Sequence, residues 1–168
     1  MELAEIKKED FDGIYRAMCE AFPYEERRDR EAAEVLLQSP RYRVYHTVQD
    51  GVPVGFVTLW LLEDFTFLEH FVTYPAYRCR GYGSLVLAVL KERYGRLLLE
   101  AEPPDTPLAA RRQRFYQREG FLVNPYPYVQ PSYHGEGTGV PLVLMSYPAP
   151  LAAPEAAVSR LYREVYGR

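Results

Sequence analysis

The feature that most constrains the fold is a strand, a turn and a helix between residues 65 and 94. Residues 65–73 have the pattern of a strand with bulky apolar side chains on both of its faces, and Pro75 ends this strand. A basic turn at 78–83 leads into an apolar helix that ends at Gly95, and the apolar run at 96–101 is typical of a buried parallel strand. Because strand, crossover helix and strand form a right-handed unit, the segment predicts two parallel strands inside the sheet.

The remaining segments predict more strands and helices around this unit. Alternating apolar residues predict strands at 2–7, 42–49, 52–62, 121–123 and 140–146, and Asp50-Gly51 predicts a hairpin turn. Helical spacing predicts helices at 11–22, 30–38, 107–119 and about 154–166, with Asp10 and Thr106 as N-caps of the first and third. The three prolines and three glycines of residues 124–139 predict a shaped loop or an interrupted hairpin.

Length, charge and cysteine content narrow the class of protein. A chain of 168 residues with 48% hydrophobic residues fits one domain spanning 1–168, and a net charge of -3 argues against nucleic acid as a partner. Cys19 and Cys79 form neither a disulfide framework nor a metal motif. The N-terminus lacks the pattern of a signal peptide, and no apolar run approaches the ~20 residues of a membrane span. We therefore expect a cytoplasmic protein without membrane partners or metal.

The basic turn has the composition of a phosphate-binding loop. Gly81 and Gly83 permit positive φ and let a ligand approach the main chain, while Arg78 and Arg80 add positive charge. The start of the following helix offers unpaired N–H groups and the positive end of the helix dipole. The turn therefore predicts a pyrophosphate cradle, and the alternative is a simple turn before a helix.

Two motifs and the order of the segments resemble the GNAT acetyltransferase superfamily over nearly the whole chain. The motifs are Arg-x-x-Gly-x-Gly at 78–83 and Phe-Tyr-x-x-x-Gly-Phe at 115–121. The resemblance implies an α/β (α+β) fold with a mixed, mostly antiparallel twisted sheet and helices on both faces. It also implies that the two parallel strands splay apart to admit acetyl-CoA.

The resemblance assigns the residues that bind acetyl-CoA. The pantetheine arm is expected on main-chain groups of Phe71, Val72 and Thr73. The pyrophosphate is expected on the cradle formed by Arg78, Cys79, Arg80, Gly81, Tyr82, Gly83 and Ser84. Two positions depart from the family pattern. Ala109 stands where many members have an asparagine that contacts pantetheine, and Cys79 stands where glycine is common.

The resemblance also implies a general acid, Tyr116, which would protonate the departing CoA thiolate; the alternative is a packed aromatic residue. A general base is useful because deprotonating an ammonium with a pKa near ~10.4 at neutral pH costs about 4 to 5 kcal/mol. Strand alternation places Glu69 among phenylalanines, which predicts a raised pKa and a base, and it points His70 away from Glu69. Glu100 and Glu102 are second candidates. A main-chain N–H at an irregularity of this strand would stabilise the oxyanion.

The alternative for Glu69 is an ion pair with an arginine that only stabilises the sheet. Four tyrosines are predicted to line the acceptor pocket, although they would equally cover the core: Tyr24, Tyr126, Tyr128 and Tyr133. We expect His134 to be solvated, and we disfavour Cys79 as a nucleophile because no histidine lies near it in sequence.

The charged run at 24–30 does not decide the acceptor. Its acidic residues Glu25, Glu26 and Asp29 suit an amine, whereas Arg27 and Arg28 suit a carboxylate. The resemblance implies an N-acetyltransferase that uses acetyl-CoA, and we expect it to act on a primary amine of a small molecule or peptide, as a monomer or homodimer. The alternatives are a catalytically silent acyl-CoA-binding or regulatory module, and a protein that binds the phosphates of another nucleotide.

Overall fold

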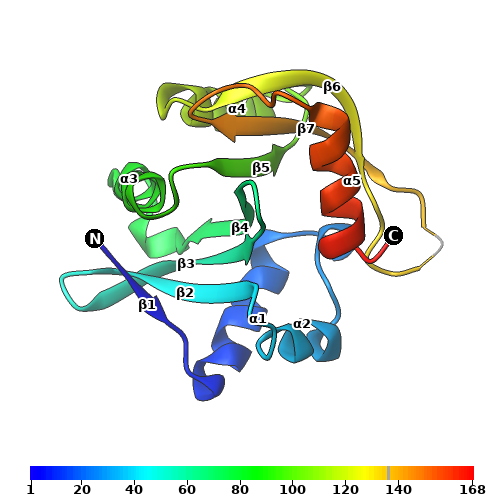
Figure 1. Cartoon of the computed structure of the whole chain (residues 1–168). Coiled ribbons are helices and arrows are strands. Elements are labelled where there is room, and N and C mark those ends of the chain that lie inside the picture. The colour runs from blue at the N-terminus through cyan, green and yellow to red at the C-terminus, as the bar shows by residue number, and fades with distance from the viewer. Residues whose placement is uncertain (136) are drawn as a thin grey trace.

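The computed structural model describes residues 1–135 and 137–168, and its strands form a seven-stranded sheet in the order β1-β2-β3-β4-β5-β7-β6 (Figure 1). The strands are β1 (Glu2–Glu5), β2 (Tyr42–Gln49), β3 (Val52–Leu61), β4 (Thr66–Thr73), β5 (Leu97–Ala101), β6 (Leu122–Gln130) and β7 (Val140–Tyr147). The sheet is mixed and mostly antiparallel, with β4 and β5 as a parallel pair, which confirms the predicted fold class.

Helices connect the strands and cover the sheet. The α-helices are α1 (Phe11–Ala21), α2 (Arg30–Leu36), α3 (Tyr82–Tyr94), α4 (Pro107–Arg118) and α5 (Pro154–Glu164), and the short 3-10 helices are η1 (Lys8–Asp10), η2 (Tyr24–Glu26) and η3 (Pro75–Tyr77). Among the described residues, no helix is long and apolar enough to cross a membrane. Thr106 caps α4 as predicted, because its Oγ1 accepts from the Ala109 N–H at 3.1 Å. The carboxylate of Asp10 instead accepts from the Lys7 N–H, so it caps η1 and not α1.

The hydrogen bonding between β4 and β5 stops after a short stretch. The paired residues run from Thr66 opposite Leu97 to Leu68 opposite Leu99. Both strands then continue without pairing to each other. The two strands are joined by α3, as the strand, helix and strand pattern predicted. The expected splaying of the parallel strands is therefore present beyond Leu68 and Leu99.

A β-bulge at Glu69 changes the alternation of β4. Thr58 of β3 lies opposite His70, and the next residue, Leu59, lies opposite Leu68, so Glu69 has no partner on β3. The extra residue shifts the alternation of the side chains that follow it. The prediction that Phe67, Glu69 and Phe71 share one face is therefore wrong: Phe67 belongs to one core cluster and Phe71 packs against the other.

Part of the segment expected to be irregular is strand β6. The pairing of β6 with β7 is interrupted between Asn124 and Tyr128, and Pro125 and Pro127 lie in this interruption. Strand β6 is at the edge of the sheet, where a missing N–H removes no ladder hydrogen bond. Prolines are therefore compatible with a strand here. Glu136, in the same predicted loop, lies outside the described residues.

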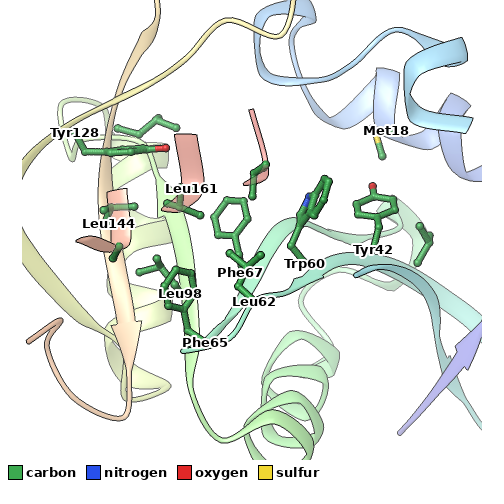
Figure 2. Packing of buried hydrophobic residues seen from close by; sticks show 14 of the residues in the cluster. Met18, Tyr42, Trp60, Leu62, Phe65, Phe67, Leu98, Tyr128, Leu144 and Leu161 are labelled. Carbon is green, nitrogen blue, oxygen red and sulfur yellow. The ribbon is translucent and has the colours of Figure 1, made fainter. Parts of the chain in front are cut away.

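Two apolar clusters hold the helices on opposite faces of the sheet. One cluster combines Ile14 and Met18 of α1 with Leu161 of α5, and Phe67 lies between Leu161 and Trp60 at its centre (Figure 2). The other cluster contains side chains of α3 and α4 that pack against the opposite face: Val86, Leu87, Leu90 and Tyr116. Helices on both faces were predicted, and this arrangement confirms the prediction.

The close approach of β3 and β4 gives a stability test at Gly55. A Cβ on Gly55 would lie 2.0 Å from the Val72 carbonyl oxygen, so Gly55→Ala must displace β4 and should destabilise the protein by about 3 kcal/mol. Gly13 in α1 has nothing within 4 Å of its added Cβ, so Gly13→Ala should stabilise it by about 0.5 to 1 kcal/mol. Urea unfolding measures the free energy of unfolding of both variants. Equal changes in Gly55→Ala and Gly13→Ala would contradict this packing.

Candidate active site

A cleft of about 910 Å³ opens where β4 and β5 separate. Its walls include residues 68–73 of β4 and 99–102 at the end of β5, together with the first turn of α3 and one face of α4. The end of α1, Glu26 of η2, Gln130 of β6 and Leu142 of β7 also line it. The cleft therefore unites most of the predicted site residues, although they are far apart in the sequence.

After Leu68, the main chain of β4 makes no ladder hydrogen bonds along the side that faces the cleft. The N–H of His70 donates to Thr58 Oγ1 at 3.1 Å and that of Tyr74 donates to Val54 at 2.9 Å, so both point toward β3. Successive residues of a strand direct their main-chain groups to opposite edges, which places those of Phe71 and Thr73 on the edge where β5 has separated. The structure corrects the prediction for Val72, because its carbonyl oxygen faces Gly55 on β3.

The first turn of α3 presents unpaired donors to the same cleft. The N–H groups of Gly81, Tyr82 and Gly83 have no acceptor among the described residues, and Gly81 takes a φ of 79° that favours glycine. Cys79 has a φ of 61°, which lies in the left-handed region that favours glycine. The geometry suits a phosphate group held by main-chain N–H groups and the helix dipole.

Other members of the predicted cradle differ in their roles. Arg78 lines the cleft and its Nε donates to the Thr73 carbonyl at 3.1 Å, whereas Arg80 does not line the cleft and lies over the ring of Tyr77. Ser84 lines the cleft, but its Oγ donates to Glu119 Oε1 at 2.5 Å and its N–H donates to the Gly81 carbonyl. The polar groups of Ser84 are therefore already paired within the protein.

Glu69 forms a buried ion pair with Arg28. The two side chains are 1% and 11% exposed, and Arg28 Nη1 donates to Glu69 Oε1 while Tyr133 also donates to Oε1, at 3.1 Å. Burial alone would raise the pKa of Glu69, but the charge of Arg28 and the hydrogen bond from His70 outweigh it and lower the pKa. The prediction of a raised pKa is wrong, and the arrangement matches the alternative of an ion pair with an arginine.

His70 lies beside Glu69, contrary to the prediction that it points away. Its Nδ1 is 3.5 Å from Glu69 Oε2 and 2.8 Å from Thr58 Oγ1. The bulge at Glu69 causes the difference, because it turns two consecutive side chains toward the same region. His70 is 3% exposed and packs edge-on against Phe22.

Glu100 has a different environment from Glu69. Its carboxylate accepts hydrogen bonds from Tyr128, from Tyr166 at 2.8 and 2.9 Å, and from Gln130 Nε2 at 2.9 Å. Burial raises the pKa of Glu100 to about 7, although the tyrosine hydrogen bonds favour the charged form. Glu100 therefore lines the cleft with a pKa suited to proton transfer near neutral pH. The other second candidate, Glu102, is paired with Arg112.

Tyr116 packs between Phe115 and Phe121 and also lines the cleft. Its hydroxyl has no hydrogen-bond partner among the described residues, yet it is not sealed from solvent, so it is open to the cleft. Burial raises its pKa to about 12, which keeps the hydroxyl protonated. Ala109, on the same helix, is 3% exposed and offers no side-chain polar group.

None of the four tyrosines predicted to line the acceptor pocket lines this cleft in the described part of the chain. Tyr128 is 4% exposed in the core, where its hydroxyl donates to Glu100. The ring of Tyr133 faces the Arg28 guanidinium, whose Cζ is 4.4 Å from the ring centroid. Tyr24 stacks on His134 at 3.7 Å, so His134 is not simply solvated, and Tyr126 lies on the edge strand β6.

The sequence interpretation missed three contributors to the site, which are Gln130, Tyr166 and the main chain of Val165. Tyr166 donates to Glu100, and the Val165 carbonyl accepts from Arg28 Nη2 at 2.6 Å. Both follow α5, whose apolar stripe gave no sign that its end contacts Arg28 and Glu100. Among the described residues, no cluster of three or more His, Cys, Asp or Glu side chains is placed to hold a metal ion.

The buried ion pair gives a stability test. Arg28→Met leaves the Glu69 carboxylate buried without its partner and should cost about 3 to 5 kcal/mol of unfolding free energy. Removing both charges, with Arg28→Met and Glu69→Met together, should recover much of this loss. The control is Arg30→Met, which breaks exposed pairs with Asp12 and Glu34 and should cost far less. Urea unfolding decides, and similar losses for the two single variants would contradict the burial argument.

Comparisons with known proteins agree with this geometry. The model of the Acetyltransferase (GNAT) family matches residues 11–121. The chain is 32% identical over 109 residues to a Bacillus subtilis (strain 168) protein named "Putative acetyltransferase YjbC", and the match covers 64% of this chain and 55% of that relative. The chain therefore spans little more than half the length of this relative.

Solved structures extend the likeness to the whole chain. A protein of Bacteroides thetaiotaomicron described as a "Putative acetyltransferase from GNAT family" is 31% identical, with a TM-score of 0.93 over 100% of this chain and 99% of that one. An aminoglycoside 6'-N-acetyltransferase solved with coenzyme A shares the fold at 15% identity, with a TM-score of 0.63 over 90% of this chain and 99% of that one. The chain belongs to the GNAT acetyltransferase family.

Proposed function

We propose that the protein is an N-acetyltransferase that transfers the acetyl group of acetyl-CoA to a primary amine of a small molecule or peptide. The observation that carries the proposal is the combination, in one cleft, of unpaired N–H groups at the start of α3, an open main-chain edge on β4 and the Tyr116 hydroxyl. Family membership and a structural neighbour solved with coenzyme A support this assignment.

The residues of the cleft fit acetyl-CoA. The N–H groups of Gly81, Tyr82 and Gly83 would hold the pyrophosphate, with Arg78 beside them. The Phe71 carbonyl and the Thr73 N–H would pair with the amides of the pantetheine arm, which need acceptors and donors of this kind. Acetyl-CoA supplies an acetyl group activated as a thioester.

Glu100 and Tyr116 would handle the two protons of the reaction. Glu100 takes a proton from the acceptor ammonium, and the freed nitrogen forms a C–N bond with the acetyl carbonyl carbon. The C–S bond breaks, and Tyr116 gives its proton to the departing sulfur. The N–H of Phe71 faces the side where negative charge would develop on the carbonyl oxygen. The nitrogen gives its second proton to solvent as it becomes an amide, and solvent returns a proton to Tyr116 and takes the one held by Glu100. The products are the N-acetylated amine, the CoA thiol and one released proton.

Replacing Tyr116 by phenylalanine tests the function and the general acid together. Calorimetric titration should show that the wild type binds acetyl-CoA in preference to ATP and NAD. Tyr116→Phe should bind acetyl-CoA equally well, but its release of CoA thiol in the presence of an amine should fall roughly 100-fold, because the departing sulfur lacks its proton donor.

The control is Tyr94→Phe, which removes a hydroxyl that bonds Tyr45 away from the cleft and should leave turnover unchanged. Unchanged turnover in Tyr116→Phe would remove this residue from the mechanism. Binding of acetyl-CoA by the wild type without turnover of any amine would favour a catalytically silent acyl-CoA-binding module. Absence of acetyl-CoA binding would refute the proposed function.

The pKa of Glu100 predicts how activity depends on pH. Only the deprotonated carboxylate accepts a proton, so kcat/KM should rise as the pH increases through about 7 and fall below it. Glu100→Gln should lower kcat/KM by roughly 100-fold and abolish this limb of the profile. Exposed Glu92 on α3 provides the control, since Glu92→Gln should keep the wild-type profile. An unaltered pH limb in Glu100→Gln would assign the base to another group.

A further inference from the structure

The arginines of the charged run at 24–30 are turned away from the cleft. Arg27 Nε donates to the Phe22 carbonyl at 3.3 Å, and its Nη1 donates to the Tyr15 hydroxyl at 3.1 Å. Arg28 is bound by Glu69 and by the Val165 carbonyl. Neither arginine lines the cleft, so neither is placed to receive a carboxylate of the acceptor.

Two partly buried carboxylates of the cleft lack a basic partner. Glu69 and Glu102 are paired with arginines, but Glu26 and Glu100 have no basic side chain within salt-bridge distance among the described residues. Burial raises the pKa of both Glu26 and Glu100, and for Glu26 the charge of Glu102 adds to the effect while nearby Arg112 and His70 offset part of it. A positive ligand would relieve the cost of holding these two charges in a partly dry site.

Gln130 adds a neutral acceptor beside Glu100. It is 4% exposed and lines the cleft, and its Nε2 donates to Glu100 Oε2 at 2.9 Å and to the Tyr166 hydroxyl at 3.2 Å. Because the carboxylate only accepts, the amide nitrogen must face it, and Gln130 Oε1 is left buried without a donor. An ammonium group has three N–H donors and no acceptor, so it can satisfy Glu100 and Gln130 Oε1 together.

Three arginines of the cleft come from the turn before α3 and from α4, and they have no carboxylate partner within salt-bridge distance among the described residues: Arg78, Arg111 and Arg118. The fourth, Arg112, is paired with Glu102 and is close enough to Glu26 to lower its pKa, so it lies toward the carboxylates. Glu26 and Glu100 come from η2 and β5 and lack an arginine partner. The positive charge beside the proposed pyrophosphate cradle is therefore left for phosphates, and these two carboxylates are left for the acceptor.

We propose that the acceptor is a short aliphatic diamine. Its reacting ammonium lies between Glu100 and Gln130 Oε1, and its second ammonium faces Glu26. An acceptor with a carboxylate in the second position is disfavoured, because that group would face Glu26 instead of an arginine. This inference rests on the proposed function and names the substrate class of the same site.

Three probes with the same four-carbon chain test it on the wild-type protein. Putrescine carries a second ammonium, butylamine carries no second charge, and γ-aminobutyrate carries a carboxylate there. With acetyl-CoA as donor, kcat/KM for putrescine should exceed that for butylamine by roughly 10-fold to 100-fold, the range expected for a charge-assisted hydrogen bond, and γ-aminobutyrate should be the poorest acceptor.

A matched pair of variants locates the second ammonium. Glu26→Gln should reduce the ratio of kcat/KM for putrescine to that for butylamine by roughly 10-fold or more. Glu25→Gln removes the neighbouring exposed carboxylate, which does not line the cleft, and should leave this ratio unchanged. Measuring a ratio within each variant removes any general effect of the substitution on folding or on turnover.

The outcomes separate this inference from the proposed function. If acetyl-CoA binds, and kcat/KM for butylamine or γ-aminobutyrate equals or exceeds that for putrescine, the diamine inference is wrong but the acetyltransferase function stands. An unchanged ratio in Glu26→Gln also overturns the inference. If acetyl-CoA does not bind at all, the proposed function falls first and the inference falls with it.

Discussion

The site depends on hydrogen bonds that the sheet does not make. Where β4 and β5 stop pairing after Leu68 and Leu99, the main-chain groups of Phe71 and the N–H of Thr73 lose their partners on β5, and the Thr73 carbonyl keeps only Arg78. Main-chain polar groups need a partner, so a splayed pair of strands creates a demand that water or an extended ligand with amide groups can meet. The same separation makes room for Glu100 and Tyr116 to line one cleft from opposite faces of the sheet.

The bulge at Glu69 determines how charge is arranged around this opening. It turns the Glu69 carboxylate to Arg28 and brings His70 beside it, so one carboxylate of the cleft has a lowered pKa and a buried positive partner. Glu100, which has tyrosine and amide donors but no cation, keeps a pKa near neutrality. The two glutamates directly follow the last residues of β4 and β5 that pair with each other. Their pKa values nevertheless differ, because one carboxylate has an arginine partner and the other does not.

Local signals in the sequence predicted most of the elements. The hairpin at Asp50-Gly51, the Thr106 cap and the unit of strand, helix and strand each depend on residues close in sequence, and each is present. The predicted directions of the Glu69 and His70 side chains were wrong because alternation assumes a regular strand. No residue of β4 is typical of a bulge, so the sequence did not indicate one. Gln130 and Tyr166 were missed because only the folded chain brings them to Glu100.

The contacts after α5 join residues that are far apart in the sequence. The Val165 carbonyl binds Arg28 across 137 residues, and Tyr166 binds Glu100 across 66. The first turn of α3, by contrast, takes its shape from residues close in sequence, such as the Gly81 carbonyl that accepts from the Ser84 and Leu85 N–H groups. Loosening the segment after α5 would therefore disturb the surroundings of Glu69 and Glu100 and leave the turn before α3 as it is.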